Sequence, residues 1–132
     1  MVRGCLILVV PVVLAVWLPH GNVRGDERTP PSAADVEFFE KKIRPLLVLR
    51  CYECHVDQGK GVKGGLHLDS RTGLLTGGDS GPAVVPGKPA ESLLVEAINY
   101  AQEGVQMPPR GKLPENEIDL LSEWVRRGAP FP

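Results

Sequence analysis

The stretch "CYECH" places two thiols and an imidazole within five positions, at Cys51, Cys54 and His55. It restricts the chemistry of the chain more than any other feature. A Cys-x-x-Cys pair can be a redox dithiol in a βαβ unit, one half of a zinc site or, when His follows directly, the attachment site of a c-type haem. Each alternative requires different residues elsewhere in the chain.

The first 25 residues have the pattern of a secretory signal peptide. A basic start is followed by fourteen mostly apolar residues, 5–18, which Pro11 interrupts. A membrane-spanning helix needs about 20 apolar residues, so this run is short for a span. Val23 and Gly25 suit a signal-peptidase site. We therefore predict cleavage after residue 25, a periplasmic or other extracytoplasmic location, and no membrane span in the mature form. An uncleaved anchor is the alternative.

Removal of this leader leaves few residues that could act as ligands. The remaining chain has two cysteines, Cys51 and Cys54, two histidines, His55 and His67, and a single methionine, Met107. The leader holds two of the fifteen basic residues and no acidic one, so thirteen basic residues face sixteen acidic ones. Such a chain lacks the basic character of nucleic-acid-binding proteins, and its length suits one small domain.

Hydrophobic periodicity predicts an all-α domain of three to four helices separated by long loops. Residues 26–34 form a polar linker, and the folded domain covers 35–132. Pro45 should interrupt the first helix, because proline disfavours a helical conformation at the residue before it. The expected helices cover 35–50, 88–101 and 114–127, whereas the glycine-rich residues 59–87 should form a long loop with short turns and a brief extended piece at 66–70.

These helices would bury a thin core. The last one presents a single apolar stripe of Ile118, Leu121, Trp124 and Val125, and aromatic residues make up only 5% of the chain. A domain of about 100 residues normally buries a larger core than this pattern supplies. A large apolar group is therefore expected at the centre of the domain, and a haem would fill that place.

The alternatives for the CYECH cluster have different requirements. A thioredoxin-like dithiol needs a βαβ context, but the residues before Cys51 have a helical pattern. Zinc needs four ligands, which here would be Cys51, Cys54, His55 and His67, and a His directly after a Cys fits the usual spacing poorly. A disulfide between the two cysteines would close a small, strained loop. We favour haem, because two thiols three residues apart can add to its two vinyl groups while His55 becomes the proximal iron ligand.

The sixth iron ligand is predicted from the small number of residues that could serve as one. Met107 stands in "VQMPPR", a loop stiffened by Pro108 and Pro109. Methionine is the usual second axial ligand of cytochromes c. The alternatives are that Met107 only fills the core, or that His67 is the ligand. His67 alternates with Leu66 and Leu68, which favours a surface position.

Four stretches together resemble the planctomycete-type cytochrome c domain, a class I-like c-type cytochrome. They are "EFFEKKIRPLLVLRCYECH", "GGLHLDSRTGLLTGGDSGPAVVPGKPAESLL", "MPP" and "LPENEIDLLSEWVRRGAPFP", and the similarity covers roughly residues 35–132. The resemblance implies a class I cytochrome c-like fold whose first and last helices cross, with Phe39 near Trp124. It also implies Cys51 and Cys54 as haem attachment sites, with His55 and Met107 as iron ligands.

Two departures from the family matter. There, the domain usually begins a much longer secreted protein, so this chain is either a stand-alone carrier or a truncated piece. Class I cytochromes also often have a Gly-Pro after CxxCH whose carbonyl orients the proximal histidine. Residues 56–65 contain no proline, so the acceptor for His55 stays unassigned.

The expected function is electron transfer through one covalently attached haem c. The sequence supplies no general base, no nucleophile with its partner and no substrate pocket, so we do not expect an enzyme. The expected partner is a redox protein of unknown identity, and we expect a monomer that binds no nucleic acid. A haem-based sensor or peroxidase-like module with an open or labile distal site is one alternative. A non-haem zinc-binding module is another.

Overall fold

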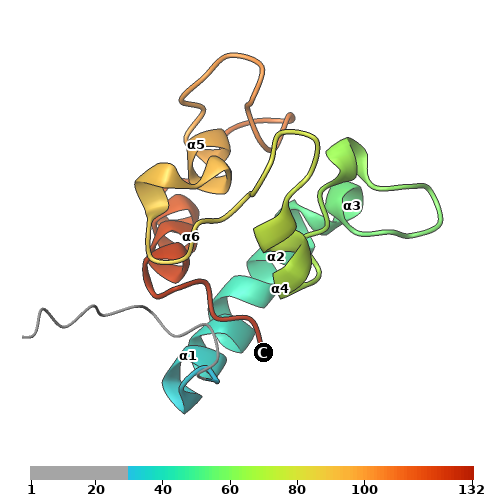
Figure 1. Ribbon diagram of the computed structural model, residues 1–132. Coiled ribbons are helices and arrows are strands. Elements are labelled where there is room, and N and C mark those ends of the chain that lie inside the picture. Colours follow the sequence, from blue (N-terminus) through green and yellow to red (C-terminus); the bar gives the residue numbers. More distant parts are fainter. Residues whose placement is uncertain (1–29) are drawn as a thin grey trace, which may run out of the picture.

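The computed structural model describes residues 30–132, so the predicted signal peptide and residues 26–29 of the predicted linker lie outside it. All regular elements of the described part are helices (Figure 1), which confirms the all-α prediction. None of these helices is both long and apolar enough to cross a bilayer. In chain order the elements are α1 Ala33–Phe38, η1 Phe39–Ile43, α2 Arg44–Arg50, α3 Tyr52–His55, η2 Lys63–Gly65, α4 Arg71–Thr76, η3 Pro89–Glu91, α5 Leu93–Ile98 and α6 Glu115–Arg126.

The first three elements form one N-terminal rod. Ser32 begins it, because its side-chain oxygen accepts a hydrogen bond from the Asp35 N–H at 3.1 Å. The middle element η1 is a π-helical turn, in which the Arg44 N–H donates to the Phe39 carbonyl five residues back. Pro45 explains this turn, since proline lacks an N–H and its ring clashes with the carbonyl four residues before it. The predicted interruption at Pro45 is thus confirmed as a new helical start at Arg44.

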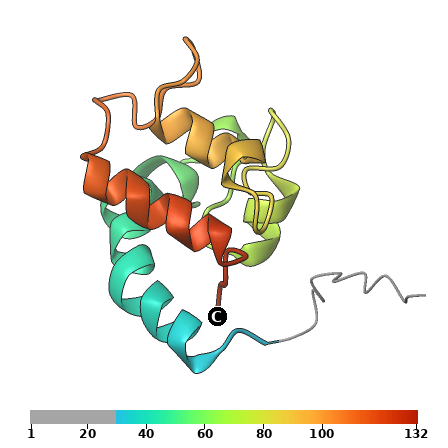
Figure 2. The same cartoon turned by 90° about the vertical axis from the view of Figure 1, so that its left-hand side faces the viewer.

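The last helix, α6, packs against η1 of the rod (Figure 2). All four residues of its predicted apolar stripe are buried. The ring centroids of Phe39 and Trp124 lie 5.9 Å apart, as the resemblance implied. Gly128 has a φ of 94°, a left-handed conformation that glycine adopts readily at the end of a helix. The Trp124 indole N–H then donates to the Pro130 carbonyl at 2.9 Å, which holds the C-terminal tail on the core.

The prediction of a continuous loop over 59–87 is wrong at one place. Helix α4, Arg71–Thr76, lies inside it, and its Leu74 is almost fully buried. The Ser70 side chain caps this helix by accepting from the Gly73 N–H at 3.0 Å. Periodicity missed it because six residues are fewer than two turns, and Gly73 lowers the helix propensity.

The helix expected over 88–101 is also shorter than predicted. Its first part is the separate 3₁₀ turn η3, and α5 covers only Leu93–Ile98. Ser92 separates the two, since its buried hydroxyl donates to the Lys88 carbonyl at 2.9 Å and accepts from the Val85 N–H at 2.9 Å. Tyr100 follows with a φ of 59°, outside the helical region. As a result no helix lies between α5 and α6, in the segment that carries Met107.

Candidate functional site

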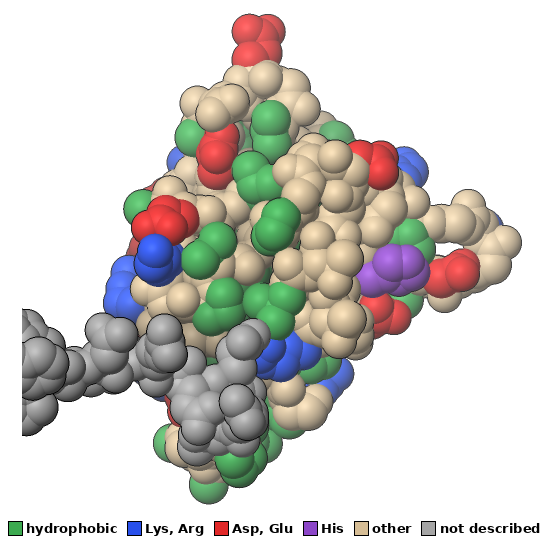
Figure 3. Space-filling view, viewed as in Figure 1, with side chains coloured by type: hydrophobic (Ala, Val, Ile, Leu, Met, Phe, Trp, Pro, Cys, Tyr) green, Lys and Arg blue, Asp and Glu red, His purple; other side chains and the backbone are tan. Residues whose placement is uncertain are grey.

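One cavity brings the four predicted site residues together. Cys51, Cys54 and His55 line it from the rod and α3, and Met107 lines it from the segment between α5 and α6. We call this space the central cavity. Its remaining wall is mostly apolar and includes Leu66, Leu68, Ala83, Leu94, Ala97 and Ile98. Hydrophobic side chains also gather over the middle of the face seen in Figure 3, with charged ones nearer its edges.

The attachment turn, residues 51–55, continues directly from the rod. The Cys51 N–H donates to the Leu47 carbonyl at 2.9 Å, so the turn starts from a helix whose Leu47 is fully buried. The N–H groups of Cys54 and His55 both donate to the Cys51 carbonyl at 3.1 Å. Residues three apart on a helical turn lie on the same side. This local geometry therefore presents both sulfur atoms to one cavity.

The two thiols are free and both are half-buried. Burial raises the pKa of the Cys51 thiol to about 11, although the neighbouring Arg50 opposes this shift. At neutral pH Cys51 is therefore a protonated thiol within an apolar wall. No disulfide joins it to Cys54, so both sulfurs are available for covalent attachment.

His55 lies on the wall with an incompletely satisfied ring. Its Nδ1 atom is buried and has no hydrogen-bond partner. Burial lowers the pKa of His55, and the nearby backbone of Leu66 and Lys63 partly offsets that effect. A buried nitrogen without a partner is costly, and a neutral imidazole is the form that binds metals. Two free thiols, a largely neutral imidazole and an apolar wall together fit a c-type haem.

Backbone contacts hold Met107 beside α5. Its N–H donates to the Ala97 carbonyl at 3.0 Å, and the Tyr100 hydroxyl donates to the Pro108 carbonyl. The Met107 side chain is 40% exposed, so it borders the cavity at a place open to solvent. The sequence analysis missed Tyr100, because its role depends on a contact eight residues along an irregular loop.

Two glycine-rich turns form another part of the wall. The Asp79 N–H donates to the Gly64 carbonyl at 2.8 Å. A Cβ atom on Gly78 would lie 2.1 Å from the Gly64 carbonyl oxygen, so only glycine permits this approach. Both turns line the central cavity. The letters "GGDSG", residues 77–81 of the second family-like stretch, thus have a physical reason, which the sequence alone did not supply.

The structure does not bring His67 to the other candidate ligands. Its side chain is 48% exposed, with Nδ1 3.9 Å from an Asp69 carboxylate oxygen, and it does not line the central cavity. Within residues 30–132 no group of three or more His, Cys, Asp or Glu side chains is placed to hold a metal ion. The zinc alternative thus has no ligand cluster in the described part of the chain.

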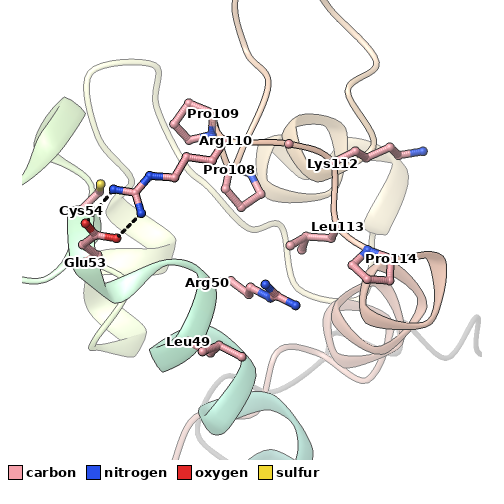
Figure 4. Close-up of a pocket in the computed structure, with 11 residues that line it drawn as sticks. Leu49, Arg50, Glu53, Cys54, Pro108, Pro109, Arg110, Lys112, Leu113 and Pro114 are labelled. Carbon is pink, nitrogen blue, oxygen red and sulfur yellow. Dashed lines mark hydrogen bonds and ion pairs between the residues drawn. The ribbon is translucent and has the colours of Figure 1, made fainter.

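A second hollow with charged walls lies beside the central cavity (Figure 4). We call it the outer hollow. The two spaces share Arg50, Cys54, Pro108 and Pro109 as walls. Arg50 forms a bidentate ion pair with Glu117 of α6, with N–O distances of 2.8 and 3.0 Å. The outer hollow has no candidate ligand other than Cys54, so the central cavity is the candidate site.

Comparison with known proteins gave one match. Residues 51–111 match the family described as "Planctomycete cytochrome C". This range contains Cys51, Cys54, His55 and Met107. No curated protein and no solved structure matched the chain.

Proposed function

We propose, from the premise that this chain carries a planctomycete-type cytochrome c domain, that it holds one haem c and transfers electrons outside the cytoplasm. Membership of this family makes the domain a haem-binding one. One observation carries the finer proposal. Met107, far along the chain from the CYECH motif, lines the same apolar cavity as Cys51, Cys54 and His55.

Each of these side chains has a proposed role. Cys51 and Cys54 would hold the haem through thioether bonds, with His55 and Met107 as its axial ligands. When bound, the haem supplies the Fe(II)/Fe(III) couple, whose potential depends on the axial ligands and on burial. The apolar wall would keep water away from the iron and favour its less charged, reduced state.

The proposed role is that of a carrier and not of an enzyme. The proposed partner is a redox protein of unknown identity, met by a monomeric carrier that binds no nucleic acid. Cytochrome c domains are typically extracytoplasmic, in agreement with the predicted export signal, which lies outside the described residues. The excess of acidic residues would favour a partner with a basic surface.

One observation favours a second candidate function. Met107 lies in a segment without helix, where its N–H is bonded to the Ala97 carbonyl, and a ligand on such a segment would be a weak barrier to an incoming ligand. A labile Met107 would leave an iron site for a gas-sensing or peroxidase-like role. Rapid carbon monoxide binding by the untreated reduced protein would favour this function over electron transfer.

The test is a set of visible spectra of the protein produced with a c-type haem maturation system. We expect a Soret band, a c-type α-band on reduction, one iron per chain, and the weak far-red band that thioether ligation gives ferric haem. Met107→Ala should remove the far-red band, lower the reduction potential and open the iron to carbon monoxide, whereas the matched variant His67→Ala should change none of these.

Other outcomes would redirect the proposal. A ferric haem spectrum that lacks the far-red band in the unmodified protein would reassign the distal position to His67 or leave it open. A protein without any Soret band would return the CYECH cluster to zinc or to a dithiol.

A further inference from the structure

The segment between α5 and α6, residues 99–114, carries Met107 without any helix to position it. Near Met107, the contacts that tie it to the body of the domain lie on the α5 and α6 side. They include the hydrogen bond from the Met107 N–H to the Ala97 carbonyl and the buried side chain of Leu113. None of these contacts reaches the attachment turn. The segment therefore needs another contact to fix Met107 relative to Cys51, Cys54 and His55.

An ion pair supplies this contact (Figure 4). The Arg110 guanidinium donates two hydrogen bonds to the Glu53 carboxylate, at 2.9 Å and 3.2 Å. Glu53 stands between the two cysteines of the attachment turn, and Arg110 follows Met107 by three residues. Within residues 30–132, no other hydrogen bond or ion pair joins these two parts.

The position of the pair relates it to the iron ligands. Glu53 and Arg110 line the outer hollow next to Cys54, Pro108 and Pro109, which are also walls of the central cavity. Proline fixes φ in its own residue, so Pro108 and Pro109 stiffen the link between Met107 and Arg110. A restraint on the Arg110 guanidinium therefore also restrains the position of the Met107 thioether.

From this geometry we infer that Glu53 and Arg110 form a latch that keeps Met107 over the haem iron. Both are positioning residues, and the inference rests on the proposed function, in which Met107 is the distal ligand. The latch closes the irregular distal segment onto the helical turn that carries the attachment sites. When it opens, Met107 leaves the iron more often, and an external ligand enters faster.

The expected effect is small, because the pair is solvent-exposed. The Arg110 and Glu53 side chains are 81% and 69% exposed, and water and salt weaken such pairs. A bidentate geometry favours the upper end of the usual range. Loss of the pair should therefore speed the entry of an external ligand by roughly 2- to 5-fold.

The experiment measures the rate of carbon monoxide binding to the reduced, haem-loaded protein, together with the far-red band of the ferric form. Glu53→Gln and Arg110→Gln should each raise the rate by a similar factor and weaken the band. The double variant should exceed neither, and the charge exchange Glu53→Arg with Arg110→Glu should restore most of the original rate. High salt should bring the unmodified protein toward the variants.

The matched control is Lys41→Gln, which removes one positive charge from an exposed ion pair with Glu37 on the N-terminal rod, away from the cavity. Its rate should equal that of the unmodified protein. Equal rates in Arg110→Gln and Lys41→Gln, or strictly additive effects of the two latch variants, would overturn the latch. Because Met107→Ala tests the ligand separately, a failed latch leaves the proposed function standing. A rate that Met107→Ala does not change would overturn both.

Discussion

The two sides of the central cavity are built in different ways. Cys51, Cys54 and His55 follow one another on a helical turn that extends the N-terminal rod. Met107 lies in a segment without helix, where its own N–H donates to the Ala97 carbonyl. The neighbouring Pro108 accepts a hydrogen bond from Tyr100, and Arg110 pairs with Glu53. One side is thus fixed by continuous secondary structure, and the other by a few separate bonds. We therefore expect the distal side to open first.

The largest effect should come from removing the support of the helical side. Phe39 is fully buried and packs against Trp124 and Phe131, at centroid distances of 5.9 and 4.6 Å. Phe39→Ala should lower the free energy of unfolding by about 3–5 kcal/mol, measured by denaturant titration. Val48→Ala, on the same rod but 53% exposed, should change it by less than about 0.5 kcal/mol. Similar losses in both variants would show that the rod does not anchor this side.

The burial of Cys51 predicts a pH effect in the haem-free protein. Its pKa of about 11, against an ordinary 9.0, leaves about a hundredth of the usual thiolate near pH 8, so alkylation of Cys51 should be about 100-fold slower than in the unfolded chain. Because the folded pKa is the higher one, its contribution to stability is complete below pH 9 and is lost between about pH 9 and 11. Alkylation followed by mass spectrometry measures the rate. Equal alkylation rates in the folded and unfolded chains would show that the Cys51 thiol is exposed to solvent in the folded protein.

A substitution at Gly78, in the glycine-rich turns of the cavity wall, should affect both sides of the central cavity. Gly78→Ala would push a methyl group against the Gly64 carbonyl, and such overpacking costs about 1–3 kcal/mol. Thermal unfolding should detect this loss. Ser80→Ala, exposed in the same turn, is the control and should leave the melting temperature unchanged. An unchanged melting temperature in Gly78→Ala would mean that the two turns separate freely.

The smallest effect should be confined to the distal side. Tyr100→Phe removes the hydroxyl that donates to the Pro108 carbonyl, a loss of about 0.5–1.5 kcal/mol. We expect faster carbon monoxide binding by the reduced protein with little change in global unfolding. Tyr52→Phe is the matched control, since the Tyr52 hydroxyl has no hydrogen-bond partner. If Tyr100→Phe lowered global stability as much as Phe39→Ala, the distal segment would belong to the main folding unit.

The sequence was informative where local structure decides the outcome. The α6 stripe, the break at Pro45 and the pairing of Phe39 with Trp124 follow from periodicity, proline chemistry and family resemblance, and the structure agrees with them. Cys51, Cys54 and His55 could be grouped because they are neighbours in the chain. These features need no knowledge of distant contacts.

Features that depend on distant contacts could not be predicted in the same way. The short helix α4 and the late start of α5 instead rest on nearby side-chain hydrogen bonds of Ser70 and Ser92, which periodicity does not reveal. The Glu53–Arg110 pair joins residues 57 positions apart. Nothing in either local sequence distinguishes this glutamate and arginine from solvated surface charges. The roles of the four ligands themselves stay predictions that the spectra will test.

The π-helical turn η1 sets the direction in which the attachment turn faces. Such a turn accommodates one additional residue in an otherwise regular helix. An α-helix rotates by about 100° per residue, so an ordinary α-helical turn over the same residues would rotate the helix from Arg44 onward by about that angle about its axis. Leu46 and Leu47 would leave the core, and the cysteines would be aimed away from the cavity. The angular phase of the haem-attachment residues is therefore determined upstream of the CYECH motif, in a part of the chain that contains none of the ligands.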